Sequence, residues 1–320
     1  MKKYRNYRIL VTGGTGFIGS HVIEELLKLS DEIFVPYLEI VPNSYFTISK
    51  LKNKVHLTKL NLKDRIKVFS YLKANKINFI FHLAAQTLVT KAFLEPYETI
   101  ENNIMSTLNI LEYARINKSI KGVIIASSDK AYGKTTKAYN ENSPLKGDHP
   151  YDVSKSAKDL IAQTYFKTYK TPVVITRFAN VYGEGDMHLD RIIPGICEAI
   201  SNNKKLQIRS DGSYVRDYIY VKDVAKAYIL FFEKFDSIKG ESYNISSNDS
   251  LSVVELIRIV EKSMHIKVPH VINNSAENEI PYQHLNWQKV KKLGWKPEYS
   301  LAKTIPAINL WYKKNLFIIK

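Results

Sequence analysis

The chain has 320 residues, of which 45% are hydrophobic and 24% charged, as expected for a globular protein of one large or two small domains. Its single cysteine, Cys197, excludes a disulfide framework and a zinc site built from cysteines, and it fits a reducing cytoplasm. No apolar run approaches the roughly 18 residues of a membrane helix, and the basic N-terminal segment lacks a signal-peptide pattern. We therefore expect a cytoplasmic protein without a membrane partner.

Lysine dominates the charge of the sequence. The chain has 47 basic and 31 acidic residues, a formal net charge of +16, and most of the basic residues are lysines spread along its whole length. Nucleic-acid-binding proteins usually gather their basic residues in one patch. We therefore expect solvated lysines, no nucleic-acid partner and an attraction for anionic small molecules.

Strands and helices alternate in the first half of the chain. Apolar runs predict strands at 7–12, 33–37, 55–60, 79–83, 122–126 and 173–176, and helical periodicity predicts helices at 21–29, 66–74, 104–115 and 153–169. Such alternation predicts an α/β protein whose parallel sheet is covered by helices on both faces. After residue 178 the rhythm breaks into loops and short helices, including one at 253–264, which indicates a second, smaller lobe.

A glycine-rich turn follows the first predicted strand. Residues 13–19 read GGTGFIG, and in this setting the glycines allow a tight turn, close approach of a pyrophosphate and close packing of helix on strand. The anion would lie on free N–H groups at the helix N-terminus. The motif predicts dinucleotide binding by Gly13, Gly16, Phe17, Ile18 and Gly19.

An acidic residue that binds the ribose is expected about 20 residues after the glycine motif. The count leads to Glu39, and no arginine lies nearby to bind a 2′-phosphate. NAD is therefore favoured over NADP.

Tyr151 and Lys155 form a Y-x-x-x-K pair at the start of a predicted helix. Residues four apart share a helix face, and a lysine ammonium there would lower the pKa of the tyrosine phenol from about 10, which suits a general base. Ser127 or Ser128 ends the buried strand upstream, where a hydroxyl could bind the same substrate oxygen.

Five segments resemble the extended short-chain dehydrogenase/reductase superfamily and its NAD-dependent epimerase/dehydratase family: GGTGFIGS (13–20), FHLAAQ (81–86), SS (127–128), YDVSK (151–155) and RFANVYG (177–183). The resemblance implies a Rossmann, doubly wound domain for NAD at residues 1–178 and about 217–243. It also implies a smaller C-terminal α/β lobe for a nucleotide sugar at residues 179–216 and 244–320. In this family the tyrosine takes the proton of a sugar hydroxyl while hydride passes from the same carbon to the nicotinamide. A homodimer or homotetramer is implied as well.

The resemblance assigns further contacts by position. It implies cofactor contacts from Asn61, Leu62, Leu83, Ala84 and Ala85, with Asp64 also near the adenine. The substrate contacts that it implies are Asn180, Arg191, Ile193, Arg209, Arg216 and Gln283.

The residues after the two serines select the reaction within this family. The 4-epimerases usually lack an acid–base pair there, whereas 4,6-dehydratases carry one, and Asp129-Lys130 resembles the pair of CDP-glucose 4,6-dehydratases. The segments at 141–151 and 185–194 resemble the same subgroup. By this resemblance Asp129 would protonate the departing C6 hydroxyl and Lys130 would remove the C5 proton. Those roles need a protonated Asp and a neutral Lys, and burial moves both pKa values in that direction.

Several alternatives stay open from the sequence. They are a dehydratase for UDP-N-acetylglucosamine or another nucleotide sugar, a 4-epimerase, and a non-catalytic NAD-binding scaffold. An ordinary ion pair of Asp129 with Lys130 is a separate alternative to their acid–base roles. The eight histidines show no metal-ligand spacing, so we expect no metal, and we expect a structural role for His82.

Overall fold

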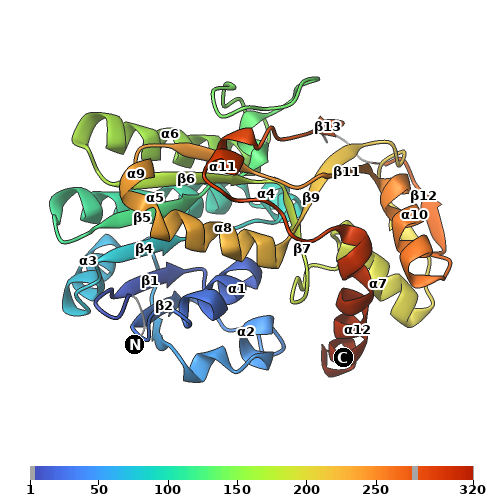
Figure 1. The fold of residues 1–320 in the computed structure, drawn as a ribbon, viewed down its shortest axis with the longest axis horizontal. Helices are drawn as coiled ribbons and strands as arrows, with labels where there is room; N and C mark the ends of the chain where they lie inside the picture. The colour runs from blue at the N-terminus through green and yellow to red at the C-terminus, as the bar shows by residue number, and fades with distance from the viewer. Residues whose placement is uncertain (1–3, 276–279, 320) are drawn as a thin grey trace.

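The computed structural model describes residues 4–275 and 280–319. Its larger sheet has seven strands in the order β10-β6-β5-β4-β1-β2-β3, all parallel (Figure 1). Most of these strands are short runs of apolar residues buried at nearly every position, as expected when helices cover both faces of a parallel sheet. The strands are β1 (Ile9–Thr12), β2 (Ile33–Tyr37), β3 (His56–Lys59), β4 (Phe79–His82), β5 (Gly122–Ala126), β6 (Val173–Phe178) and β10 (Ser242–Ile245).

Two sets of helices cover this sheet. On one face α1 and α8 pack over the core that contains Val11, Phe81 and Phe232. On the other face α3, α5 and α6 pack over the core that contains Leu10 and Ile125. The helices of this domain are α1 (Phe17–Leu26), α2 (Tyr45–Ile48), α3 (Arg65–Ala74), α4 (Val89–Leu94), α5 (Pro96–Ile116), α6 (Pro150–Tyr169), α8 (Val221–Glu233) and α9 (Phe235–Ile238), with 3₁₀ turns η1 (Leu51–Asn53) and η2 (Asp129–Tyr132).

The strand order reverses between β1 and β4, which pair in register from Ile9 with Phe79 to Thr12 with His82. In doubly wound sheets the ligand crevice opens at the carboxyl ends of the strands where the order reverses. The predicted fold class is therefore confirmed, and the topology places the crevice between the glycine turn after β1 and the segment after β4.

A smaller lobe lies beside this edge of the sheet, at the right of Figure 1. Its central strand β9 (Val215–Tyr220) pairs with β7 (Asn180–Tyr182), β11 (Asp249–Ser252) and β13 (Tyr282–Gln283), and a second ladder joins β8 (Leu206–Ile208) to β12 (His270–Ile272). Three helices, α7 (Ile192–Asn202), α10 (Val253–Met264) and α12 (Leu301–Ile319), surround an apolar core of their own. Ser252 and Glu255 form a capping box that begins α10, the helix expected at 253–264.

The boundaries between the large domain and the smaller lobe lie at other residues than the sequence predicts. The predicted first domain includes residues from 217, but β9 pairs entirely within the smaller lobe, whereas β10 pairs entirely with β6 of the large sheet. Helix α11 (Gln288–Lys292) contacts β10, and Trp295 joins the core of the large domain. Pairing across the sheet, which no local pattern reveals, decides these boundaries. Residues 1–3, 276–279 and 320 of the predicted domains lie outside the described residues.

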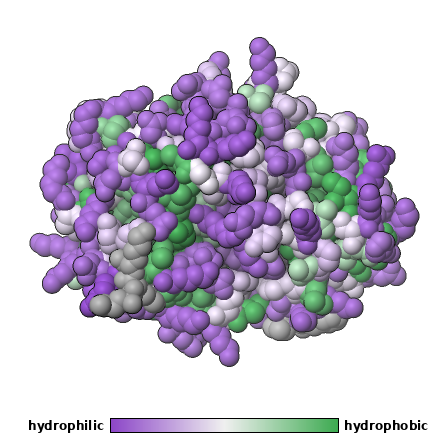
Figure 2. All heavy atoms as spheres, in the orientation of Figure 1, coloured by the Kyte–Doolittle hydropathy of each residue, from purple (hydrophilic) through white to green (hydrophobic). Residues whose placement is uncertain are grey.

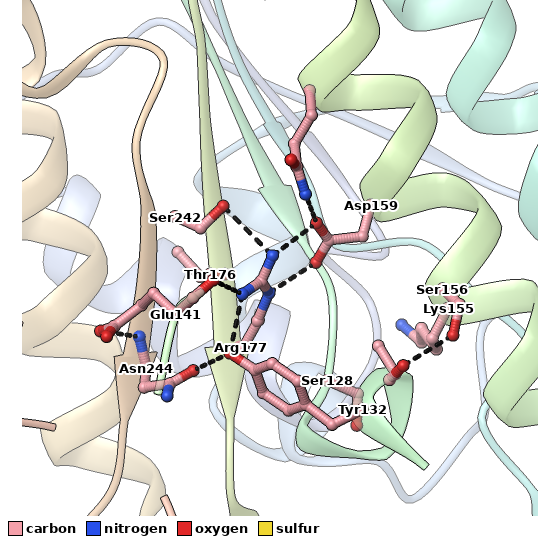
Figure 3. A network of polar contacts seen from close by, with 12 residues as sticks. Ser128, Tyr132, Glu141, Lys155, Ser156, Asp159, Thr176, Arg177, Ser242 and Asn244 are labelled. Atoms are coloured by element: carbon pink, nitrogen blue, oxygen red, sulfur yellow. Dashed lines mark hydrogen bonds and ion pairs between the residues drawn. The ribbon is translucent and has the colours of Figure 1, made fainter. Parts of the chain in front are cut away.

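A buried ion pair joins the elements beneath the crevice. Arg177 of β6 donates from Nε and Nη2 to the carboxylate of Asp159 on α6, at 2.8 and 2.9 Å, and both side chains are almost fully buried. Arg177 Nη1 also donates to the Tyr132 hydroxyl at 2.7 Å and to the Glu141 carbonyl at 2.9 Å. The Tyr132 hydroxyl in turn donates to Asn244 of β10 (Figure 3). A single guanidinium thus connects β6, α6, η2 and the loop before α6.

We expect Asp159→Asn to lower the free energy of unfolding by about 3–5 kcal/mol, because it leaves the Arg177 guanidinium buried without its counter-charge. Urea denaturation followed by circular dichroism measures the change. Asp236→Asn is the matched control, since Asp236 is 93% exposed in its pair with Lys239 and should change stability by less than about 1 kcal/mol. Equal effects of the two substitutions would contradict a stabilising role for the buried pair.

Candidate active site

A cleft of about 1880 Å³ opens between the large sheet and the smaller lobe. It brings together nearly all the site residues expected from the sequence. Those that line it are Gly13, Gly16, Phe17, Ile18, Gly19, Glu39, Leu62, Leu83, Ala84, Ala85, Ser127, Ser128, Asp129, Lys130, Tyr151, Lys155, Asn180, Arg191, Ile193, Arg209 and Arg216. Asn61 and Gln283 are not among the residues that line it.

The glycine turn fits the pyrophosphate of a dinucleotide. Gly13 has φ of +70°, and a Cβ added to it would lie 2.8 Å from the Ala84 amide nitrogen, while a Cβ on Gly19 would lie 2.2 Å from the Gly13 carbonyl oxygen. A Cβ on Gly16 would meet only that carbonyl oxygen, at 3.3 Å. Gly16 begins α1 without a side-chain cap, and no acidic residue occupies the first turn. The first amides of α1 are therefore available to an anion in the cleft.

Only some of the residues predicted to contact the adenosine end of the cofactor line the cleft. Glu39 lies just beyond β2 and is exposed at the cleft wall, and Leu62 lines the cleft beyond β3. Asn61 instead accepts a hydrogen bond from the Lys63 amide at 3.0 Å, and Asp64 caps α3 by accepting from the Lys67 amide at 3.0 Å. The local turn and the helix start thus already engage these two polar side chains.

Tyr151 and Lys155 lie on the first turns of α6 and are both buried at the cleft. The Lys155 ammonium lies 5.7 Å from the centroid of the Tyr151 ring and donates to the Ala126 carbonyl at 3.3 Å. Burial lowers the pKa of Lys155 to about 8. This lysine is therefore charged at neutral pH but close to its titration.

The pKa of Tyr151 differs from the sequence prediction. Burial is the largest influence on Tyr151, and it raises the pKa of the phenol; Arg191 and the Ser128 hydroxyl act in the opposite direction. The pKa therefore moves upward, against the lowering expected from Lys155, because desolvation penalises a phenolate strongly. Arg191, from the smaller lobe, is the cation that acts most on Tyr151.

The two serines after β5 have different surroundings. Ser128 donates to Asp129 Oδ1 at 3.0 Å and accepts from the Lys130 amide at 3.3 Å, so it begins η2. The Ser127 hydroxyl is buried and has no hydrogen-bond partner among the described residues. Of the two serines that the sequence left open, Ser128 is the one whose hydroxyl acts to lower the pKa of the Tyr151 phenol.

Asp129 and Lys130 differ in their burial. Asp129 is 3% exposed, and burial raises the pKa of its carboxyl although Lys130 lowers it. Lys130 is only partly buried, and its Nζ donates to Gln283 Oε1 at 2.9 Å. Burial thus acts on the Asp129 carboxyl in the direction expected from the sequence, and it covers Lys130 less.

The arginines of the smaller lobe are held in different ways. The partly exposed Arg191 lies just ahead of α7 and donates from Nη1 to both carboxylate oxygens of the buried Asp186, at 3.1 and 3.0 Å. Arg216 lies on β9 and donates to the Val215 carbonyl at 2.9 Å, and Arg209 is exposed at the end of β8. Asn180 begins β7 at the same cleft. Guanidinium groups at this wall suit the oxygens of a diphosphate.

Sequence reasoning missed two acidic residues of the site. Asp186 forms an ion pair with Arg191. It lies in the segment 185–194, which was predicted to matter only because it resembles CDP-glucose 4,6-dehydratases. Asp152 follows Tyr151 directly, lines the cleft and is buried, which raises the pKa of its carboxyl to about 6. Their positions in the two motifs were the available signal. His82 bonds Thr12 and Thr107 in the interior, at 2.9 and 3.1 Å, as a structural residue does.

Three comparisons relate the chain to known proteins. A family profile described as NAD dependent epimerase/dehydratase family matches residues 9–246. Human dTDP-D-glucose 4,6-dehydratase is 32% identical over 326 residues, which cover 96% of this chain and 90% of the human protein.

Solved structures of two activities are similar to the whole chain. A dTDP-glucose 4,6-dehydratase from Streptomyces venezuelae, solved with NAD bound, superposes with a TM-score of 0.86 at 26% identity and covers 97% of this chain and 98% of its own. A UDP-glucose 4-epimerase from Thermotoga maritima, solved with UDP-glucose, gives a TM-score of 0.87 at 27% identity, with coverage of 96% and 99%. The fold alone therefore does not separate dehydratase from epimerase.

Two features are absent from the described segments. Within residues 4–275 and 280–319 no helix combines the length and apolar character that crossing a membrane requires. The same residues contain no group of three or more His, Cys, Asp or Glu side chains arranged to hold a metal ion.

The glycine turn yields a prediction that separates folding from cofactor retention. We expect Gly16→Ala to leave the thermal unfolding midpoint of the cofactor-free protein nearly unchanged but to weaken NAD binding by at least about tenfold, since its methyl group would face the pyrophosphate. Gly19→Ala should lower both the thermal unfolding midpoint and the affinity for NAD, because its Cβ would collide with the Gly13 carbonyl. Calorimetric titration with NAD and differential scanning calorimetry measure the two effects. Unweakened NAD binding by Gly16→Ala would contradict the assignment of this turn.

Proposed function

The chain belongs to the NAD-dependent epimerase/dehydratase family, and from this premise we propose that it is a nucleotide-sugar 4,6-dehydratase, a hydro-lyase that uses NAD as a resident cofactor. The observation that carries the proposal is the Asp129-Lys130 pair at the carboxyl end of β5. Both residues line the cleft together with Tyr151, and Ser128 hydrogen-bonds each of the two. A 4-epimerase needs the tyrosine but has no use for this additional acid and base.

The glycine turn and the segment after β4 would hold NAD across the reversal of strand order, with Lys155 and Tyr151 at its nicotinamide end and Glu39 and Leu62 toward its adenosine end. When bound, NAD supplies a reversible oxidation of the sugar, taking a hydride from C4 and returning it at C6.

Tyr151 takes the proton of the C4 hydroxyl in the first step. The Ser128 hydroxyl and Arg191 oppose the desolvation that raises the pKa of the phenol, and the Lys155 ammonium lies 5.7 Å from the centroid of its ring. The C4 ketone that results makes the C5 proton acidic. Oxidation thus prepares the sugar for elimination.

Lys130 and Asp129 then carry out the elimination. The Lys130 amine removes the C5 proton while the Asp129 carboxyl gives its proton to the C6 hydroxyl, so that the C6–O bond breaks and water leaves. Lys130 later returns a proton to C5. Exchange with solvent balances the proton gained by Tyr151 against the one given by Asp129. Burial supports the role of Asp129, because it raises the pKa and favours the protonated acid.

The nucleotide is the finer part of the proposal. The segments at 141–151 and 185–194 support CDP-glucose as the first candidate, and the similarity to the human dTDP-D-glucose 4,6-dehydratase supports dTDP-glucose as the second. Arg191, Arg209 and Arg216 suit the diphosphate that both share.

Exposed apolar side chains on α5 and α6 support the homo-oligomer that the sequence predicts. Tyr97 and Met105 of α5 are 72% and 41% exposed, and Val153 and Leu160 of α6 are 38% and 50% exposed. The face shown in Figure 2 is that of α1 and α8 and is mostly hydrophilic, with apolar residues in separate small groups. We place the subunit contact on the α5–α6 face, since burial of these side chains would favour a dimer.

The function is tested by incubating the protein separately with CDP-glucose, dTDP-glucose, UDP-glucose and UDP-N-acetylglucosamine and following the sugar by mass spectrometry. We expect the loss of one water from CDP-glucose or dTDP-glucose. Tyr151→Phe is the control that should retain NAD and form no product. Unchanged mass with a changed sugar configuration would indicate an epimerase, and no change with any donor would favour a non-catalytic scaffold.

The α5–α6 contact predicts a particle of twice the 36.8 kDa of one chain, or a multiple of it, in light scattering coupled to gel filtration. We expect Met105→Glu with Leu160→Glu to yield monomers, because each substitution buries a charge in the contact. Leu310→Glu, at a 51% exposed position on α12, should not change the particle mass. A monomeric wild-type protein would contradict the assignment.

A further inference from the structure

A short segment of the chain, residues 281–286, forms a strap from the smaller lobe to the η2 turn. At one end Pro281 accepts from the Val215 amide at 3.0 Å, and β13 then pairs with β9 so that Gln283 lies opposite Arg216. At the other end His284 accepts from the Tyr139 amide, and the Asn286 amide donates back to Tyr139, both at 2.8 Å. The strap therefore connects β9 of the smaller lobe with the loop that follows η2.

Asp217 fixes the centre of the strap. It is 1% exposed; its Oδ1 lies 2.8 Å from His284 Nδ1, and its Oδ2 accepts from the Leu285 amide at 2.8 Å. Ser246 donates to the same Oδ2 at 2.8 Å. A buried carboxylate with several donors holds its neighbours in one arrangement.

Gln283 projects from this fixed strap to Lys130. Its side chain is 1% exposed, and its Oε1 accepts from Lys130 Nζ at 2.9 Å. Its Nε2 is buried without a hydrogen-bond partner among the described residues. The amide does not line the cleft, so its contact with the site runs through Lys130.

We propose that Gln283 is a positioning residue for the elimination step: it holds one N–H of Lys130 so that the amine nitrogen faces C5 of the bound sugar. This inference rests on the proposed 4,6-dehydratase function. Gln283 then acts through Lys130, whereas the sequence predicts that it contacts the substrate directly.

The chemical identity of Gln283 suits a lysine that acts as a base. A lysine side chain has several rotatable bonds, so an acceptor of fixed position is needed to direct its nitrogen. An amide carbonyl provides this without adding a charge, whereas a carboxylate at the same position would favour the ammonium and suppress the base. Lys130 acts on Asp129 of its own turn and on His149 and Asp152 at the start of α6, and Arg216 and Asp217 of β9 act on Asp129 beside it.

The first test isolates the base from the redox steps. The 4-keto-6-deoxy product of the wild-type reaction is returned to each enzyme in D₂O, and uptake of deuterium at C5 is followed by mass spectrometry. Exchange requires only that the base break the C5–H bond and return a deuteron. We expect Gln283→Leu to slow this exchange by at least about tenfold, as misplaced catalytic groups do, while the affinity for the product stays within about twofold.

Two variants serve as references. Lys130→Ala should abolish the exchange. Gln288→Leu, an exposed position shortly after the strap, should leave it at the wild-type rate.

The second test follows Lys130 itself and needs no substrate. Competitive acetylation of the cofactor-loaded protein across a pH series, quantified for the peptide that contains Lys130, reports the titration of its amine. Gln283→Glu should move that titration upward by about one pH unit or more, because an opposite charge within hydrogen-bond distance favours the ammonium. The C5 exchange of this variant should recover as the pH is raised.

The outcomes separate the inference from the proposed function. Slow exchange in Gln283→Leu with unchanged affinity, together with the upward titration in Gln283→Glu, supports the positioning role. Wild-type exchange in Gln283→Leu, or an unmoved Lys130 titration in Gln283→Glu, overturns the inference and leaves the dehydratase standing. A wild-type protein that removes water from no nucleotide sugar overturns the proposed function and the base role of Lys130 with it.

Discussion

The buried pair of Arg177 and Asp159 is the constraint on which the site depends. Asp159 lies one turn after Lys155 on α6, and Arg177 reaches from the neighbouring strand to both Asp159 and Tyr132, at the end of η2 (Figure 3). The helix that carries Tyr151 and the turn that carries Asp129 are therefore fixed to the same guanidinium. Two buried charges are costly unless each is fully paired and hydrogen-bonded. Satisfying them permits one arrangement of β6, α6 and η2, and that arrangement sets the geometry of the cleft.

Burial also sets the chemistry of the cleft, and it acts differently on each group. It raises the pKa of the Asp129 carboxyl, which suits an acid, and lowers the pKa of Lys155 to about 8. It also raises the pKa of Tyr151, which opposes a base. The opposing influences come from Ser128 of the large domain and Arg191 of the smaller lobe. Both parts of the protein thus act on the pKa of Tyr151.

The smaller lobe contributes to the site in two ways. Its arginines line the wall suited to a diphosphate, and Asp186 holds Arg191 in place. Its strap returns toward the large domain and holds Lys130 through Gln283. Gln283, which is distant from Lys130 in the sequence, thereby becomes its neighbour.

Local patterns in the sequence determined elements in both parts of the protein: the strands at Ile33–Tyr37 and Gly122–Ala126 and the helix at Val253–Met264 agree with their predicted bounds, and the glycine turn lies where its motif predicts. Periodicity and glycine spacing report neighbours in the chain, so they identify elements and motifs well. They missed the short helix α4, and they began α5 at residue 104, although Pro96 starts it. Tertiary structure alone decided that burial raises the pKa of Tyr151, that burial covers Asp129 more than Lys130, that Asp186 restrains Arg191, and that β10 pairs with the large sheet while β9 pairs within the smaller lobe. Each of these depends on contacts between distant segments, and desolvation and strand pairing arise only when those segments come together.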